Sequence, residues 1–174
     1  MVVQTRYAHI NNNPTVLNNH TVPIASWNLT STCWIQWFNP NTNPFVAGNL
    51  NQAFGNFIWD VAQRSNLVVS DILTTINGNL NVNNTGGYNL QLTNASSAPL
   101  NIGGTLTVAG SSSLISTVSI DGSTVNIGGT LQLSNNTKSG AINHSGGTVN
   151  INGGFIINTG CSYTCSNLPA INLK

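Results

Sequence analysis

The chain has 174 residues, a length that suits one domain or two small ones. Only 4% of the residues are charged, against about 25% in typical globular domains. Thirty asparagines, together with many Ser, Thr and Gly, supply the polarity instead. The cationic residues are scattered, which excludes a nucleic-acid binder because such a protein needs clustered positive charge; they are Arg6, Arg64, Lys138 and Lys174. The net charge of +1 favours association between copies.

The chain is hydrophobic enough to fold and carries no recognisable targeting or membrane segment. Hydrophobic residues make up 40% of it, which argues against disorder. Its first residues, MVVQTRYAHINNN, lack the apolar stretch of a signal peptide. No apolar run approaches the roughly 18 residues of a membrane span. We expect either a protein that is made inside a cell and released in an assembly, or a mature sequence without its leader.

Residues 1–66 are predicted to form a small N-terminal region of strands plus one helix. Residues 15–26 and 33–38 read as strands, and all four tryptophans lie in this region. Trp27, Trp34 and Trp37 are candidate assembly contacts, because Trp is favoured at the centres of protein interfaces. This aromatic-rich region is expected to serve in capping and assembly.

The predicted helix spans residues 49–64. Its apolar residues fall on one stripe with a period of 3.6 residues; they are Leu50, Phe54, Phe57, Ile58, Val61 and Ala62. Asn49 is a plausible N-cap and Asn66 could end the helix. Such a helix would cover the open first coil of the domain that follows, since an exposed sheet edge invites unwanted pairing.

Residues 67–174 contain a repeat. The segments LNIGGTLTV at 100–108, VNIGGTLQL at 125–133 and VNINGGFII at 149–157 align, with a weaker copy, TINGNLNV, at 75–82. Their leading isoleucines follow one another at intervals of 26, 25 and 24 residues; they are Ile76, Ile102, Ile127 and Ile151. The third full copy is interpreted as carrying one additional residue, Asn152 or a neighbour.

Each copy alternates apolar and polar residues around a Gly-Gly pair, which indicates a strand with one buried face. Further strands are predicted at 88–92, 116–120 and 140–144, giving about three short strands per repeat. This pattern predicts an all-β fold, a right-handed parallel β-helix with coils of about 25 residues. Asn101, Asn126 and Asn150 would then stack into an outer ladder, with coils about 4.8 Å apart. An antiparallel sandwich of hairpins is the alternative, favoured by the many turn residues, but hairpins need no fixed long period.

The groups that common enzymes use are sparse, so we expect no enzyme and no cofactor. Glycosidases commonly need two carboxyl groups around the scissile bond, and the only acidic residues are Asp60, Asp71 and Asp121. A serine nucleophile needs a positioned histidine and an acid. The histidines are isolated in the sequence, which also argues against a metal site; they are His9, His20 and His144.

The three cysteines admit two arrangements. Cys161 and Cys165 are close enough in sequence to close a local disulfide, which leaves Cys33 as a candidate intermolecular thiol. The alternative is that all three are reduced.

The Asn-Ile-Gly-Gly-Thr-Leu copies resemble, as a pattern, β-solenoid (parallel β-helix) proteins of bacterial surface adhesins, virus or phage fibres and other surface appendages. The resemblance covers about residues 70–174, names no single family and carries no functional residues across. It implies a structural role in a filament, virion or coat, at an extracellular, cell-surface or particle-surface location.

Two functions therefore stand as expectations. The first is a non-catalytic structural subunit that associates with copies of itself or with other structural subunits. Its last strand would join the contact through Ile171 and Leu173. The second is a binding module whose Thr and Asn ladders contact a glycan or ice, although the Thr130-Leu131-Gln132 segment breaks the Thr-X-Thr pattern that an ice-binding face would need.

Overall fold

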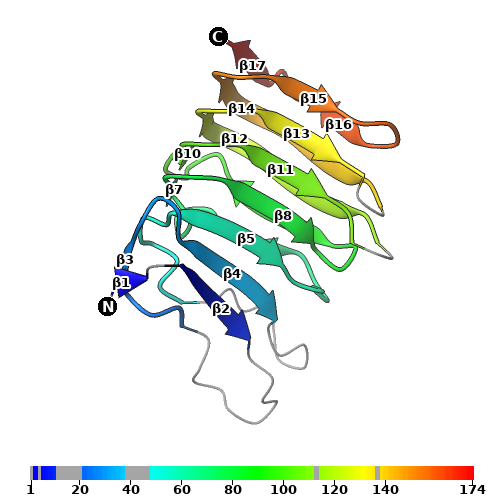
Figure 1. The fold of residues 1–174 in the computed structure, drawn as a ribbon. Helices are drawn as coiled ribbons and strands as arrows, with labels where there is room; N and C mark the ends of the chain where they lie inside the picture. The colour runs from blue at the N-terminus through cyan, green and yellow to red at the C-terminus, as the bar shows by residue number, and fades with distance from the viewer. Residues whose placement is uncertain (1, 4, 11–20, 38–47, 112–113, 136–137) are drawn as a thin grey trace.

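The computed structural model describes residues 2–3, 5–10, 21–37, 48–111, 114–135 and 138–174, and it describes the backbone alone at Val3, Ile10 and Trp37. In these residues the chain is all-β and winds into a stack of parallel coils, a β-solenoid (Figure 1). The predicted parallel solenoid is therefore confirmed, and the antiparallel sandwich is excluded because every paired strand runs parallel to its neighbour.

One side of the stack is a sheet of seven described strands. In spatial order these are β15 (Phe155–Ile157), β13 (Leu131–Ser134), β11 (Leu106–Ala109), β8 (Leu80–Asn84), β5 (Asn56–Asp60), β4 (Thr32–Trp37) and β2 (Arg6–Ile10). The order follows the sequence, because each coil adds one strand. The sheet runs across the predicted boundary at residue 66, so β2, β4 and β5 stack with the repeats.

The other two sides share an eight-stranded sheet. It contains β6 (Leu67–Val68), β7 (Thr75–Ile76), β9 (Asn89–Thr93), β10 (Leu100–Ile102), β12 (Ser116–Ile127), β14 (Gly140–Ile151), β16 (Ser162–Cys165) and β17 (Ala170–Leu173). β12 and β14 bend between the two sides, at the positive φ angles of Gly122 and Gly147. A short pair, β1 (Val2–Val3) with β3 (Ser26–Trp27), lies at the N-terminal end.

Apolar side chains of successive coils stack in columns inside the solenoid. Ile102 pairs with Ile76 on one side and Ile127 on the other, and Ile127 pairs with Ile151. All four are buried, as the repeat predicted. The same register places strand β9 at the predicted 88–92 segment, and β12 and β14 over the segments at 116–120 and 140–144.

Aromatic residues continue this core into the N-terminal coils. The rings of Trp27 and Phe54 lie 5.0 Å apart, and those of Phe54 and Phe57 lie 4.9 Å apart. Cys33 and Ile35 of β4 point into the same core. The predicted strand at 33–38 is confirmed over β4. Half of the predicted strand at 15–26 falls outside the described residues, and in the described half Ser26 alone belongs to a strand, β3.

The predicted helix over residues 49–64 is wrong. Residues 56–60 form β5, in which Phe57 and Trp59 point inward while Ile58 faces outward. Gly55, just before the strand, has no room for a side chain, since a Cβ there would lie 2.0 Å from the carbonyl oxygen of Asn28. Asn49 is not an N-cap: it adopts a φ of 61°, and its Nδ2 donates to the carbonyl of Val22.

The predicted additional residue in the third copy is also wrong. Ile127 pairs with Ile151, and Leu131 pairs with Phe155, so both copies span the corner in the same number of residues. Asn152 therefore occupies the coil position that Gly128 holds one coil earlier. The side chain of Asn152 is exposed.

Candidate functional site

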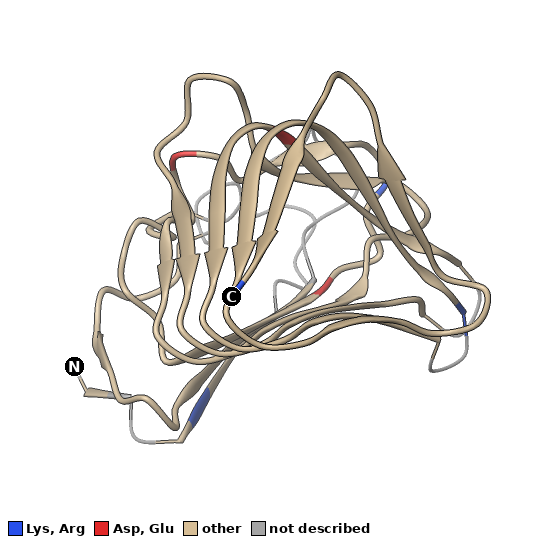
Figure 2. Ribbon diagram, turned by 90° about the horizontal axis from the view of Figure 1, so that it is seen from above, with Lys and Arg blue, Asp and Glu red and all other residues tan. Residues whose placement is uncertain are grey.

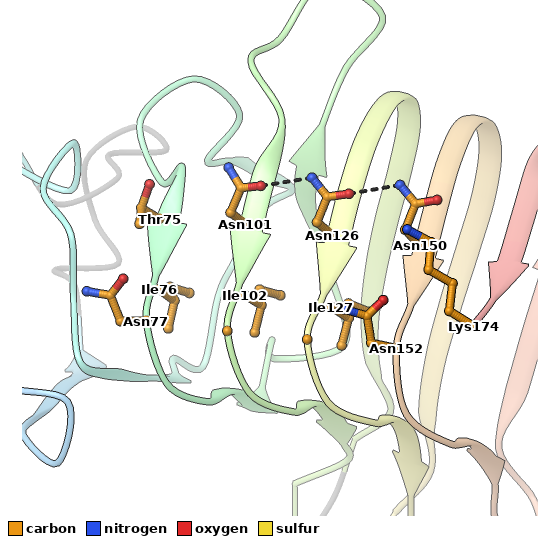
Figure 3. Close-up of a pocket in the computed structure, with 12 residues that line it drawn as sticks. Thr75, Ile76, Asn77, Asn101, Ile102, Asn126, Ile127, Asn150, Asn152 and Lys174 are labelled. Carbon is orange, nitrogen blue, oxygen red and sulfur yellow. Dashed lines mark hydrogen bonds between the residues drawn. The ribbon is translucent and has the colours of Figure 1, made fainter.

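The most regular feature of the surface is a ladder of asparagine side chains. Asn126 Nδ2 donates to Asn101 Oδ1 at 2.8 Å, and Asn150 Nδ2 donates to Asn126 Oδ1 at 2.8 Å (Figure 3). This confirms the predicted ladder. The structure adds a fourth rung that sequence reasoning missed, because Asn172 Nδ2 donates to Asn150 Oδ1 at 2.8 Å. The alignment of copies stopped at residue 157, although Ala-Ile-Asn-Leu at 170–173 repeats the same alternation.

The ladder forms one wall of a groove of about 410 Å³ that runs along the solenoid axis. The opposite wall is a row formed by Asn77, Gly103, Gly128 and Asn152, and the lining also includes Thr75 and Lys174 (Figure 3). Lys174 is the single charged residue of this lining. The groove is therefore an almost neutral channel whose polar lining consists mainly of side-chain amides, and Ile76, Ile102 and Ile127 complete the lining.

Glycine at the corner keeps the coils stacked beside this groove. A Cβ on Gly103 would lie 2.2 Å from the carbonyl oxygen of Asn77, and one on Gly128 would lie 2.3 Å from that of Gly103. Real Cβ atoms do not approach backbone oxygens so closely, because the atoms would overlap. Gly103 and Gly128 thus allow the close packing of successive corners.

The second candidate site is the last coil, at the C-terminal end of the stack. Among the described residues, each of its strands pairs on one side alone: β15 with β13, and both β16 and β17 with β14. The outer edges of these three strands present backbone N–H and C=O groups without a strand partner (Figure 1).

The core is open at this end. Ile157 pairs with the buried Leu133 but is 47% exposed, and Leu173 pairs with the buried Ile151 but is 62% exposed. Ile171 is half-buried against the core. Of the predicted assembly contacts, Ile171 and Leu173 thus lie together on one open face. The loop before β17 adds Leu168, which is fully exposed and has a φ of 55°.

The predicted tryptophan contacts lie elsewhere. Trp27 is buried in the N-terminal core, where its Nε1 donates to Gln52 Oε1 at 2.9 Å, so it is not available to a partner. Trp34 is half-buried on the outer face of β4, with the Arg6 guanidinium 3.5 Å from its ring centroid. The side chain of Trp37 lies outside the described residues.

All three cysteines are free thiols. Cys33 is 0% exposed, so its thiol cannot reach a partner in the folded coil. Burial also raises the pKa of this thiol. Cys165 ends the extended strand β16 and Cys161 immediately precedes it. Four residues of extended strand span about 13 Å, whereas a disulfide needs Cα atoms within about 7 Å. A bond between Cys161 and Cys165 would therefore require β16 to rearrange.

One histidine is buried beneath the last coil. His144 Nδ1 and the Tyr163 hydroxyl lie 2.8 Å apart, and Nε2 has no hydrogen-bond partner. Burial lowers the pKa of His144, an effect that the backbone near Gly146 and the carboxylate of Asp121 oppose. Burial also raises the pKa of Tyr163. The pair joins β14 to β16 and has no access to solvent at the imidazole.

Asp71 and Asp121 serve as hydrogen-bond acceptors within the fold. Asp71 Oδ1 accepts from the Ala98 N–H at 2.7 Å, and Asp121 Oδ1 accepts from the Ser145 hydroxyl. Figure 2 shows that charged residues are few and dispersed around the coil. In the part of the chain that the structure describes, no group of three or more His, Cys, Asp or Glu could hold a metal ion.

The described residues include no helix with the length and hydropathy needed to cross a membrane. Comparison of the chain with protein-family models, with curated proteins and with solved structures finds no match. The groove and the open last coil are therefore the two candidate sites of this chain.

Proposed function

We propose that this chain is a non-catalytic structural subunit of an extracellular or particle-surface assembly, such as a filament, virion or coat, and that copies join end to end. The observation that carries the proposal is the open last coil. Its inward side chains, including Ile157 and Leu173, are exposed where the same columns one coil earlier are buried. Apolar area of this kind gains about 25 cal/mol per Å² when it is covered.

Charge supports the same proposal. Soluble β proteins usually protect their edge strands with charged residues, above all lysine. From residue 155 onward the chain has one charged side chain, Lys174. The last coil thus combines unpaired strand edges and apolar side chains with little electrostatic repulsion between copies.

The partner that fits this end is a second copy of the chain, in the same orientation. β15 and β2 are the two ends of the seven-stranded sheet, and all its strands run parallel. A copy placed head to tail would set its β2 beside β15 and extend the sheet without changing direction. Addition of a strand to an exposed sheet edge is an established mode of recognition.

The ice-binding alternative has less support. An ice-binding face needs a flat, regular array, and the outward column of the seven-stranded sheet is irregular; along the stack it contains Trp34, Ile58, Asn81, Thr107, Gln132 and Ile156. The regular asparagine column borders a groove instead.

The test is the oligomeric state of the purified 174-residue chain. Sedimentation velocity over a range of concentrations, with electron microscopy of the same samples, should show oligomers or filaments that grow with concentration. Ile157→Lys places a charge on the open core face and should give monomers. Ile115→Lys is the matched control, because Ile115 is 50% exposed in the loop before β12. A wild-type monomer at high concentration would refute the proposal, and equal assembly of the Ile157→Lys variant would refute the end-to-end contact.

A further inference from the structure

The groove beside the asparagine ladder has hydrogen-bonding capacity that the fold does not use. Asn126 and Asn150 each donate one N–H and accept one hydrogen bond along the ladder. A side-chain amide has two N–H donors and two oxygen lone pairs, so each amide retains one donor and one acceptor.

The backbone N–H groups of the opposite wall, by contrast, are already paired. The N–H groups of Gly103, Gly128 and Asn152 all donate to carbonyl oxygens one coil earlier. The side-chain amides are therefore the groups that the groove offers to a ligand.

These amides repeat at the spacing of the coils, about 4.8 Å. From Thr75 through Asn101 and Asn126 to Asn150, the lining covers three coil spacings, about 14 Å along the axis. A row of identical groups at a constant interval suits a linear ligand that repeats one polar unit at a similar interval. It suits a compact small molecule less well, because most of the row would remain unused.

Two kinds of linear polymer do not fit. An extended peptide presents alternate residues to one side at about 6.7 Å, which falls out of step with the amides after one coil. A nucleic acid needs several cations to neutralise its phosphates, and Lys174 is the single cation of the groove. The lining carries no carboxylate either, so it does not select a cationic polymer.

We infer that the groove binds a linear, uncharged glycan along the solenoid axis, with about one sugar unit per coil. A sugar hydroxyl both donates and accepts a hydrogen bond, and each ladder amide retains one group of each kind. The groove is lined by residues of a single chain, from Thr75 to Lys174, and the contact does not depend on a second copy, so it is a separate proposal from the end-to-end assembly above.

The experiment observes the amides directly. Side-chain NH₂ resonances of ¹⁵N-labelled protein are recorded while cello-, chito-, xylo- and manno-oligosaccharides are added in turn. At least one of these probes should shift the resonances of Asn126 and Asn150 and leave that of Asn143 unchanged; Asn143 is exposed on β14, outside the groove. The affinity should change little between low and high salt, because the recognition is uncharged.

Three alanine variants separate the groove from the ladder. Asn150→Ala should weaken binding roughly tenfold through the loss of direct hydrogen bonds. Asn172→Ala removes a ladder bond but lies outside the groove lining, and it should bind as tightly as the wild type. Asn143→Ala, on the same strand as Asn150, should also have no effect.

Three results would overturn the inference: no probe shifts the groove amides, binding is lost at high salt, or Asn172→Ala weakens binding as much as Asn150→Ala. Thermal melting of each variant checks that the fold is retained, and Asn150→Gln, which keeps an amide, gives a second test at the same position if Asn150→Ala does not fold.

Discussion

Truncation of one isoleucine in the middle of the stack and another at its open end should have very different effects on stability. Ile127 is buried between Ile102 and Ile151, so Ile127→Ala should lower the free energy of unfolding by about 3 kcal/mol. Ile157 is 47% exposed, so Ile157→Ala should cost about half as much, ~1.5 kcal/mol. In a solenoid each coil contacts its neighbours alone, and the second loss should therefore be confined to the last coil.

Urea unfolding followed by circular dichroism measures the first quantity, and hydrogen exchange at the amides of β15–β17 measures the second. Exchange in the last coil should accelerate in Ile157→Ala while the amides of β10 and β11 keep their protection. If copies stack through this end, the cost of Ile157→Ala should rise with protein concentration, because the neighbouring copy buries the side chain. Equal costs for the two variants at low concentration would refute the stacked-coil reasoning.

Three further predictions concern individual residues. Gly128→Ala should destabilise the protein by about 1–3 kcal/mol or more, since the new Cβ would lie 2.3 Å from the Gly103 carbonyl oxygen. Gly154→Ala is the control and should be nearly neutral, because the atom nearest to its new Cβ is 3.6 Å away. Thermal melting of the two variants measures the difference. The lowered pKa of His144 means that the unfolded chain binds a proton more readily than the folded one. Stability should therefore be retained above pH of about 6.5 and fall as the pH drops below it, and urea titrations at several pH values should show a smaller fall in His144→Phe. A thiol reagent should label Cys165 but not Cys33 in the folded protein, and mass spectrometry of labelled peptides would contradict this if Cys33 reacted first.

The repeat domain was predictable because its inward residues recur in one motif. Ile102 and Ile127 sit before Gly-Gly pairs in two nearly identical segments, and parallel stacking is what brings such copies into register. Alternation alone also placed Asn101 and Asn126 on the outer face, which was sufficient to predict the ladder.

The N-terminal coils were not predictable in the same way. Their inward positions hold Cys33, Phe57 and Trp59 in place of Leu and Val, and no Asn-Ile-Gly-Gly motif marks their corners. The apolar residues between 50 and 62 fit a helical stripe by spacing, yet aromatic residues at alternate positions favour a strand. Residues 56–60 form a strand because they pair with β4 on one side and β8 on the other. These pairings are tertiary contacts, which the local spacing of apolar residues does not reveal.

The groove could not be predicted because it depends on how two rows converge at the Gly-Gly corner. The sequence shows that Asn126 and Gly128 lie two residues apart, but not that a channel runs between the column of asparagines and the row that contains Gly128. The open face at Ile157 and Leu173 likewise depends on the absence of a further described strand beyond β15 and β17.

The ladder also has a direction. From Asn126 to Asn172, every amide donates its Nδ2 hydrogen towards the preceding coil, so the side-chain dipoles point the same way and polarise one another. The row ends on the Oδ1 of Asn172, to which no described residue donates. The C-terminal end of the solenoid therefore has a partial negative pole, two residues from the ammonium group of Lys174, and the two ends of the stack differ electrostatically even though the chain is nearly neutral.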